Sequence, residues 1–64
     1  MLLKIKENAI GNLVEIYIDK QKNNGFKIFS GNEIMLFLDF NDNFFYVFEE
    51  DLLFWIDRDY VEEI

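Results

Sequence analysis

The stretch FFYVFEEDLLFW, from Phe44 to Trp55, decides the fold class of this chain. Nine of its twelve residues are apolar, and its three polar residues are acids that stand together in the middle. The apolar runs on either side are rich in aromatic residues, which favour β-strands. We therefore expect two short strands, at 44–48 and 52–56, joined by a turn at Glu49-Glu50-Asp51.

Similar short apolar runs recur along the rest of the chain. They cover residues 2–6, 13–19, 26–29 and 33–40, and breaks rich in Gly and Asn separate them. Among these breaks, Asn24-Gly25 is the clearest hairpin turn, because a type I′ turn needs positive φ at both central residues. Short strands at this spacing are typical of an antiparallel meander or a small barrel. The sequence thus predicts one all-β or β-rich domain over residues 1–64, with five or six strands.

The last third of the chain also permits a helical interpretation, with Asp51 as the N-cap. Four apolar residues follow at near-helical spacing, namely Ile56, Tyr60, Val61 and Ile64. The aromatic and β-branched residues of 52–56 favour a strand instead, and acids near the C-terminal end oppose the helix dipole. We expect a strand at 52–56 and leave a single helical turn at 58–63 open.

Alternation within the strands indicates which side chains share a face. One strand is expected to present Val14, Ile16 and Ile18 on a single face, and another to form a core stripe of Ile34, Leu36, Leu38 and Phe40. The strands at 44–48 and 52–56 are apolar on both faces. Their second face, which we assign to Phe45, Val47, Leu53 and Trp55, either completes the core or is covered by another chain.

Charge is distributed unevenly along the chain, whose net charge is −7. Residues 1–27 carry five lysines and three acids, a net of +2, whereas residues 28–64 carry ten acids and Arg58, a net of −9. The acidic half repels nucleic acid and anionic lipid and steers the protein toward basic partners. The lysines, at 4, 6, 20, 22 and 27, are too few for direct nucleic-acid binding. We expect neither nucleic acid nor a membrane as a partner.

The residue types present exclude several kinds of site. The chain has no Cys and no His, which removes thiolate metal sites, the commonest zinc ligand and the commonest general base. So short a chain has little room for a substrate pocket, and its clustered acids are typical of a solvated face. We expect no catalytic residue, no cofactor and no metal. A signal peptide and a membrane-spanning run are both lacking, so a cytoplasmic protein is expected.

A calcium loop is the one metal motif that the sequence suggests. Asp39, Asn41, Asn43 and Glu50 stand at positions 1, 3, 5 and 12 of such a loop. Phe44, however, stands at the position where the sharp turn of the loop needs Gly. Strand-forming aromatic residues then fill the middle of the loop, so we interpret Asn41-Asp42-Asn43 as a hairpin turn.

The tail FWIDRDYVEEI, from Phe54 to Ile64, resembles the end of an SH3 domain. In that family an apolar residue, a Pro, a variable residue and an Asn precede YV and a final aliphatic residue. Here Ile56, Tyr60, Val61 and Ile64 stand at the apolar places, while Asp57 replaces the Pro. The resemblance covers the tail alone and implies an SH3-like barrel. The family's ligand groove is not carried over, since only Tyr60 lies at a matching groove position.

These observations favour a non-enzymatic protein that binds another protein. Ten residues are expected to form its partner-binding surface: Glu49, Glu50, Asp51, Asp57, Asp59, Glu62, Glu63, Trp55, Phe37 and Phe45. The expected partner is a basic surface of a larger protein, for instance one that binds nucleic acid, as for a phage-type inhibitor or anti-defence protein that mimics DNA. The alternative is a homo-oligomeric structural or accessory subunit that assembles through its aromatic face.

Overall fold

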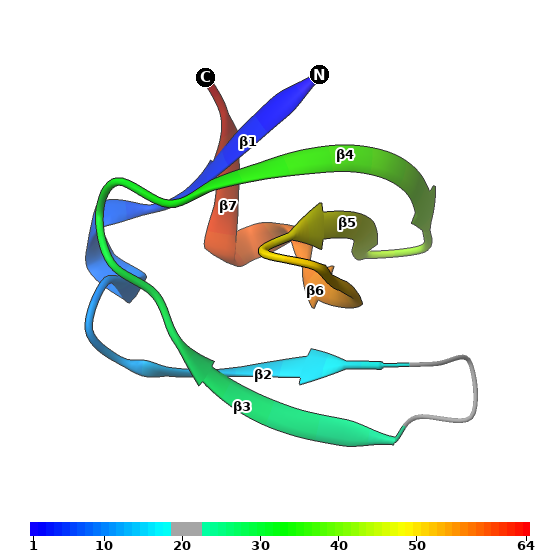
Figure 1. Cartoon of the computed structure of the whole chain (residues 1–64), viewed down its shortest axis with the longest axis horizontal. Coiled ribbons are helices and arrows are strands. Elements are labelled where there is room, and N and C mark those ends of the chain that lie inside the picture. The colour runs from blue at the N-terminus through cyan, green and yellow to red at the C-terminus, as the bar shows by residue number, and fades with distance from the viewer. Residues whose placement is uncertain (19–22) are drawn as a thin grey trace.

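Seven antiparallel strands form one curved sheet in the computed structural model, which describes residues 1–18 and 23–64 (Figure 1). The strands are β1 (Leu2–Ile5), β2 (Leu13–Tyr17), β3 (Asn24–Ile28), β4 (Ile34–Asn41), β5 (Phe44–Glu49), β6 (Leu52–Asp57) and β7 (Val61–Glu63). Two short 3₁₀ helices, η1 (Glu7–Ala9) and η2 (Arg58–Tyr60), follow β1 and β6. The strand order across the sheet is β3-β2-β6-β5-β4-β1-β7. The all-β prediction is confirmed, with seven strands in the described part of the chain rather than five or six.

The stretch 44–55 forms the centre of the sheet, as β5 and β6. The two strands pair from Phe44 opposite Asp57 to Glu49 opposite Leu52. The turn between them is Glu50-Asp51, and both residues have positive φ, 49° and 64°, as a two-residue type I′ hairpin requires. The predicted strand at 52–56 and the predicted turn before it are thereby confirmed, although Glu49 still belongs to β5.

The tail beyond β6 contains the helical turn that the sequence left open, followed by a further strand. Residues 58–60 form the 3₁₀ helix η2, and Asp57 caps it by accepting a hydrogen bond from the Asp59 N–H at 2.9 Å. The chain then continues as β7, which pairs with β1. The N-terminal and C-terminal ends of the chain therefore lie side by side (Figure 1). β7 is the strand that the sequence did not predict.

The predicted Asn24-Gly25 turn is wrong, although the hairpin itself exists. Both residues belong to β3, where they pair with Tyr17 and Ile16 of β2. Pairing continues beyond the predicted turn, and the Ile18 N–H donates to the Asn23 carbonyl oxygen at 2.8 Å. Some predictions concern residues outside the described part of the chain. These residues are Asp19, counted in the run 13–19, and Lys20 and Lys22, counted among the lysines.

A single apolar core lies on the inner side of the curved sheet. Its buried members are Leu3, Ile5, Ala9, Val14, Ile16, Phe29, Met35, Val47, Phe54, Ile56 and Val61. Within the described residues, every strand except β3 contributes at least one of them. The sheet therefore wraps around one core, with β3 and β7 as its two edges.

The core stripe predicted in β4 is wrong, because β4 turns its other face inward. Ile34, Leu36, Leu38 and Phe40 are all exposed, whereas Met35 is fully buried. Met35 lies opposite Leu3 of β1, and Leu36 lies opposite Phe48 of β5 on the outer side. A bulge between Phe37 and Asp39 then shifts the register. Both faces of β4 are apolar, so alternation alone does not indicate which one is inside.

The faces of β5 and β6 also differ from the prediction. Their two-residue turn places Val47 opposite Phe54, and both side chains are fully buried. Odd positions of β5 therefore share a face with even positions of β6. The predicted second face is split: Phe45 and Val47 are turned to the core, and Leu53 and Trp55 to the outside. Ile18, predicted to share a face with Val14 and Ile16, is exposed just beyond the end of β2.

Candidate functional site

A row of exposed apolar side chains crosses the outer side of the sheet. Leu2, Leu36, Phe48 and Leu53 lie directly opposite one another in β1, β4, β5 and β6. These four residues, called the outer row below, are between 38% and 48% exposed. Their strands are neighbours at about 4.8 Å spacing, so the outer row spans about 14 Å. Further exposed apolar residues adjoin it, namely Ile34 in β4 and Ile64 beside Leu2.

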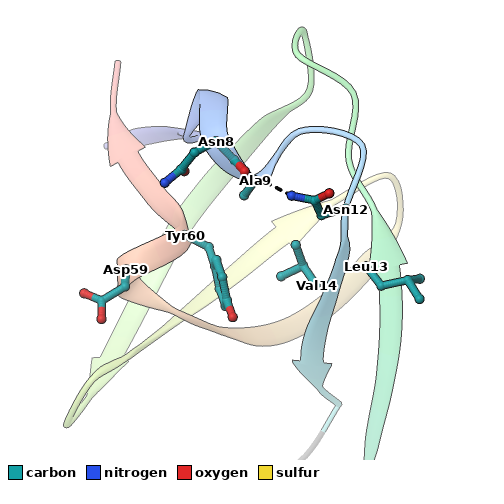
Figure 2. A pocket seen from close by; sticks show the side chains of 7 residues that line it. All are labelled: Asn8, Ala9, Asn12, Leu13, Val14, Asp59 and Tyr60. Carbon is teal, nitrogen blue, oxygen red and sulfur yellow. Dashed lines mark hydrogen bonds between the residues drawn. The ribbon is translucent and has the colours of Figure 1, made fainter.

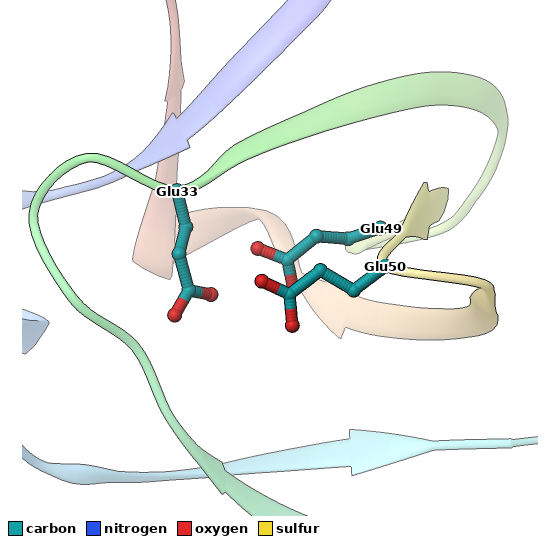
Figure 3. A group of neighbouring side chains, drawn as sticks. All are labelled: Glu33, Glu49 and Glu50. Carbon is teal, nitrogen blue, oxygen red and sulfur yellow. The ribbon is translucent and has the colours of Figure 1, made fainter.

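Acidic side chains flank the outer row at both ends. The turn Glu50-Asp51 follows directly on the Phe48–Leu53 end; both residues are exposed, and the Glu50 carboxylate is turned toward Glu49 and Glu33 (Figure 3). At the other end, Glu62 of β7 is exposed and lies opposite Lys4 of β1. The outer row is thus an apolar strip with a predominantly negative rim, a combination that typically marks an interaction site.

The seven acids predicted to bind a partner do not form one surface. Glu49, Glu50 and Asp51 lie at the β5–β6 turn, Asp57 and Asp59 at η2, and Glu62 and Glu63 in β7. Glu49 is only 4% exposed, so its carboxylate lies inside the protein. Asp57 caps η2. The other five side chains are exposed.

The three predicted aromatic anchors are also separated. Trp55 lies on the outer side, half-buried and packed on Tyr46 with 4.7 Å between ring centroids. Phe37 and Phe45 contact each other edge to face at 5.2 Å and pack against the core. The structure therefore leaves Trp55 beside the outer row and turns the two Phe side chains mainly inward.

A charged cluster lies where the β3–β4 loop meets the β5–β6 turn (Figure 3). The Lys27 Nζ is 3.4 Å from Oε1 of Glu49 and 3.6 Å from Oε2 of Glu33. It also lies 5.0 Å from the centre of the Phe29 ring. Glu33 Oε1 accepts hydrogen bonds from the backbone N–H and the hydroxyl of Ser30, both at 3.2 Å. These bonds hold the Glu33 side chain toward the interior.

The charges of this cluster perturb one another's proton affinity. Burial raises the pKa of Glu49 to about 7, and the neighbouring Glu33 carboxylate acts in the same direction. The pKa of Glu33 is lowered, chiefly by its contact with Glu49. Burial acts to lower the pKa of Lys27, but Glu49 and Glu33 outweigh it, so the pKa is raised. The cluster therefore favours the protonated form of Glu49 over that of Glu33.

Sequence reasoning missed two members of this cluster, Lys27 and Glu33. Lys27 points inward because it pairs with the buried Val14, while its neighbours Phe26 and Ile28 are exposed. The only signal in the sequence was this inverted alternation in β3. The residues of the suggested calcium loop are not brought together. Asp39, Asn41 and Asn43 lie near the turn between β4 and β5, whereas Glu50 lies beyond the other end of β5.

A small hollow lies on another side of the molecule (Figure 2). Its lining residues are Asn8, Ala9, Asn12, Leu13, Val14, Asp59 and Tyr60, and its volume is about 140 Å³. Asn12 Nδ2 donates to the Asn8 carbonyl oxygen at 3.0 Å across its upper edge (Figure 2). Sites for drug-sized ligands have volumes of about 300–1,000 Å³. This hollow is too small to be such a site.

Comparison with known protein families, with curated proteins and with solved structures found no match to this chain. Within residues 1–18 and 23–64, no helix is long and apolar enough to cross a membrane.

Proposed function

We propose that this chain is a non-enzymatic protein-binding module that docks on a basic surface of a larger protein. The observation that carries the proposal is the outer row, four large apolar side chains that lie opposite one another on adjacent strands and are exposed. Scattered exposed apolar residues are ordinary, but a contiguous strip with a polar rim is typical of a binding surface. Phe48 and the nearby Trp55 belong to the residue types that supply contact energy.

The charge of the chain supports a basic partner rather than a second copy. Two copies of a chain with net charge −7 repel each other. In a symmetric pair, the predominantly negative rim of one copy would face the same kind of rim on the other. Basic side chains on a partner would instead complement this rim and accelerate association at low salt.

A narrower form of the proposal is an inhibitor or anti-defence protein of phage type. In that case the partner surface binds nucleic acid, and the exposed acids occupy the positions of phosphates. The architecture that goes with this proposal is an SH3-like barrel. The seven-stranded antiparallel sheet around one core is compatible with such a barrel. The inhibitor hypothesis predicts that adding the protein displaces nucleic acid from the captured partner.

Affinity capture from a lysate of the source cells tests the proposal. We expect the wild-type chain to retain a basic protein at low salt and to release it as salt is raised. The variant Leu36→Ser/Phe48→Ser should lose it, and Glu50→Lys/Asp51→Lys should weaken retention. The matched control is Leu13→Ser/Ile28→Ser, which makes the same polarity change in exposed residues of β2 and β3.

Two outcomes would contradict the proposal. Capture of no protein at low salt, or equal retention by the outer-row variant, would show that this surface is not a docking site. Sedimentation of the purified chain tests whether the outer row instead binds a second copy of the chain. A dimer that dissociates in Leu36→Ser/Phe48→Ser would make a second copy the occupant and favour the homo-oligomeric alternative.

A further inference from the structure

Three carboxylates converge beside Lys27, one from the β3–β4 loop and two from the β5–β6 turn. Figure 3 shows Glu49 and Glu50 extending side by side toward Glu33. One oxygen from each lies within 4.8 Å of the others. Calcium binds carboxylate oxygens at about 2.3–2.6 Å, so oxygens on opposite sides of one ion are about 4.8 Å apart. The spacing therefore suits three ligands of one calcium ion.

A second observation concerns the hydrogen bonding of Glu49. Its side chain is 3% exposed, and neither of its carboxylate oxygens accepts a hydrogen bond. Lys27 lies near Oε1, which leaves Oε2 with neither a hydrogen-bond donor nor an ion-pair partner among residues 1–18 and 23–64. A buried carboxylate oxygen in that state is energetically costly. It is an available ligand atom on a side chain that extends into the cluster (Figure 3).

The charge balance points the same way. Lys27 contributes one positive charge, whereas Glu33, Glu49 and Glu50 contribute three negative charges when ionised. A divalent cation offsets the remaining two. The donors are all oxygen, and the chain contains no Cys or His, so the site suits a hard cation rather than zinc or copper.

We propose that Glu33, Glu49 and Glu50 together bind one calcium ion, with Lys27 retained beside Oε1 of Glu49. Glu50 is exposed, so water completes the coordination from the solvent side. Three carboxylates with a nearby ammonium give a weak site, with a dissociation constant on the order of 10⁻⁴–10⁻³ M. Calcium binding ties the β3–β4 loop to the β5–β6 turn.

Thermal unfolding of the EDTA-treated full chain, at constant ionic strength, tests this site. We expect millimolar CaCl₂ to raise the melting temperature saturably, on the order of 5 °C, and isothermal titration calorimetry to give one ion per chain. Glu50→Gln should weaken binding at least about tenfold. Asp51→Asn, which removes the same charge from the adjacent exposed residue, should bind within about twofold of the wild type.

Each other outcome overturns the proposal. No saturable shift up to about 10 mM CaCl₂ would exclude the site. Equal weakening by Asp51→Asn and Glu50→Gln would indicate diffuse charge screening instead of coordination. Tighter binding of Mg²⁺ than of Ca²⁺ would contradict the assignment from oxygen spacing. Backbone amide NMR spectra of both variants without calcium verify that they keep the wild-type fold.

Discussion

Lys27 Nζ lies 3.4 Å from Oε1 of Glu49, and the two residues face each other on the inner side of the sheet. Lys27 stands between the exposed Phe26 and Ile28, so β3 turns a cation inward and apolar side chains outward. The pair occupies the place where β3 contributes no apolar residue to the core. A polar pair in this position contributes to stability only while both partners are present.

Removing the cation from this pair should destabilise the protein. In EDTA at pH 8, we expect Lys27→Met to lower the free energy of unfolding by about 2 kcal/mol, because the buried Glu49 and the half-buried Glu33 then lack a counterion. Glu49→Gln alone should change the free energy of unfolding by less than about 1 kcal/mol. Added to Lys27→Met, it should restore the stability which that variant has lost. Urea denaturation measures both effects, and Lys4→Met, in an exposed position, serves as the control. Greater stability of Lys27→Met would contradict this account.

Two adjacent residues of β4 test which face is inside. Met35 is fully buried and Leu36 is 43% exposed. We expect Met35→Ala to lower the free energy of unfolding by about 2–5 kcal/mol, because it leaves a cavity in the core. Leu36→Ala should lower it by about 0.5 kcal/mol or less. Urea titration of the two variants compares them directly. The opposite ranking would support the core stripe that the sequence predicted, with Leu36 inside.

The hydrogen bond from the Tyr17 hydroxyl to Glu15 Oε1, at 2.8 Å, should be visible in a pH titration. This bond is the main reason why the pKa of Tyr17 is raised above 10.0. Because the folded protein holds the phenolic proton more tightly than the unfolded chain, the bond stabilises the fold below pH 10. That contribution is lost as the pH rises through the higher pKa of the folded state.

The measurement for Tyr17 is the tyrosinate absorbance of the wild type minus that of Tyr17→Phe. We expect the midpoint of this difference to lie above 10 and to fall in Glu15→Gln. A midpoint that Glu15→Gln leaves unchanged would show that the hydrogen bond is absent in solution.

The β5–β6 turn should gain stability from glycine. Asp51 has a φ of 64°, in the left-handed region that non-glycine residues adopt at a cost. We expect Asp51→Gly to raise the free energy of unfolding by about 0.5–1 kcal/mol and Asp51→Val to lower it. The control is Asp39→Gly in the interior of β4, which should be destabilising. Chemical denaturation of the three variants gives the ranking, and a destabilising Asp51→Gly would refute this turn geometry.

The sequence predicted the strands at 44–48 and 52–56 and the turn between them because their evidence is local. Aromatic residues at alternate positions favour a strand, and Glu50-Asp51 interrupts them. The strand at 61–63 has no such local signal, since two of its three residues are acidic, and its pairing with β1 defines it. The Asn24-Gly25 prediction was wrong for a related reason, because pairing with β2 extends through both residues.

The candidate site was less predictable than the fold. The sequence indicated that Trp55 and a group of acids carry function, but it placed two members of the outer row, Leu36 and Phe48, on faces turned to the core. The charged cluster joins residues 27, 33, 49 and 50, which are far apart along the chain except for the last two. No spacing rule connects them, since the contact depends on where the β3–β4 loop passes the β5–β6 turn.

By itself, the sequence determined the fold class, the strand periodicity and the acidic character of the second half, because these follow from residue types and their local order. Only the tertiary structure decided which apolar face is inside. In β4, β5 and β6 both faces are apolar, so alternation shows which residues share a face but not where that face points. The two-residue turn and the pairing with β1 make that choice, and they place Met35, Val47 and Phe54 inside and Leu36, Phe48 and Leu53 outside.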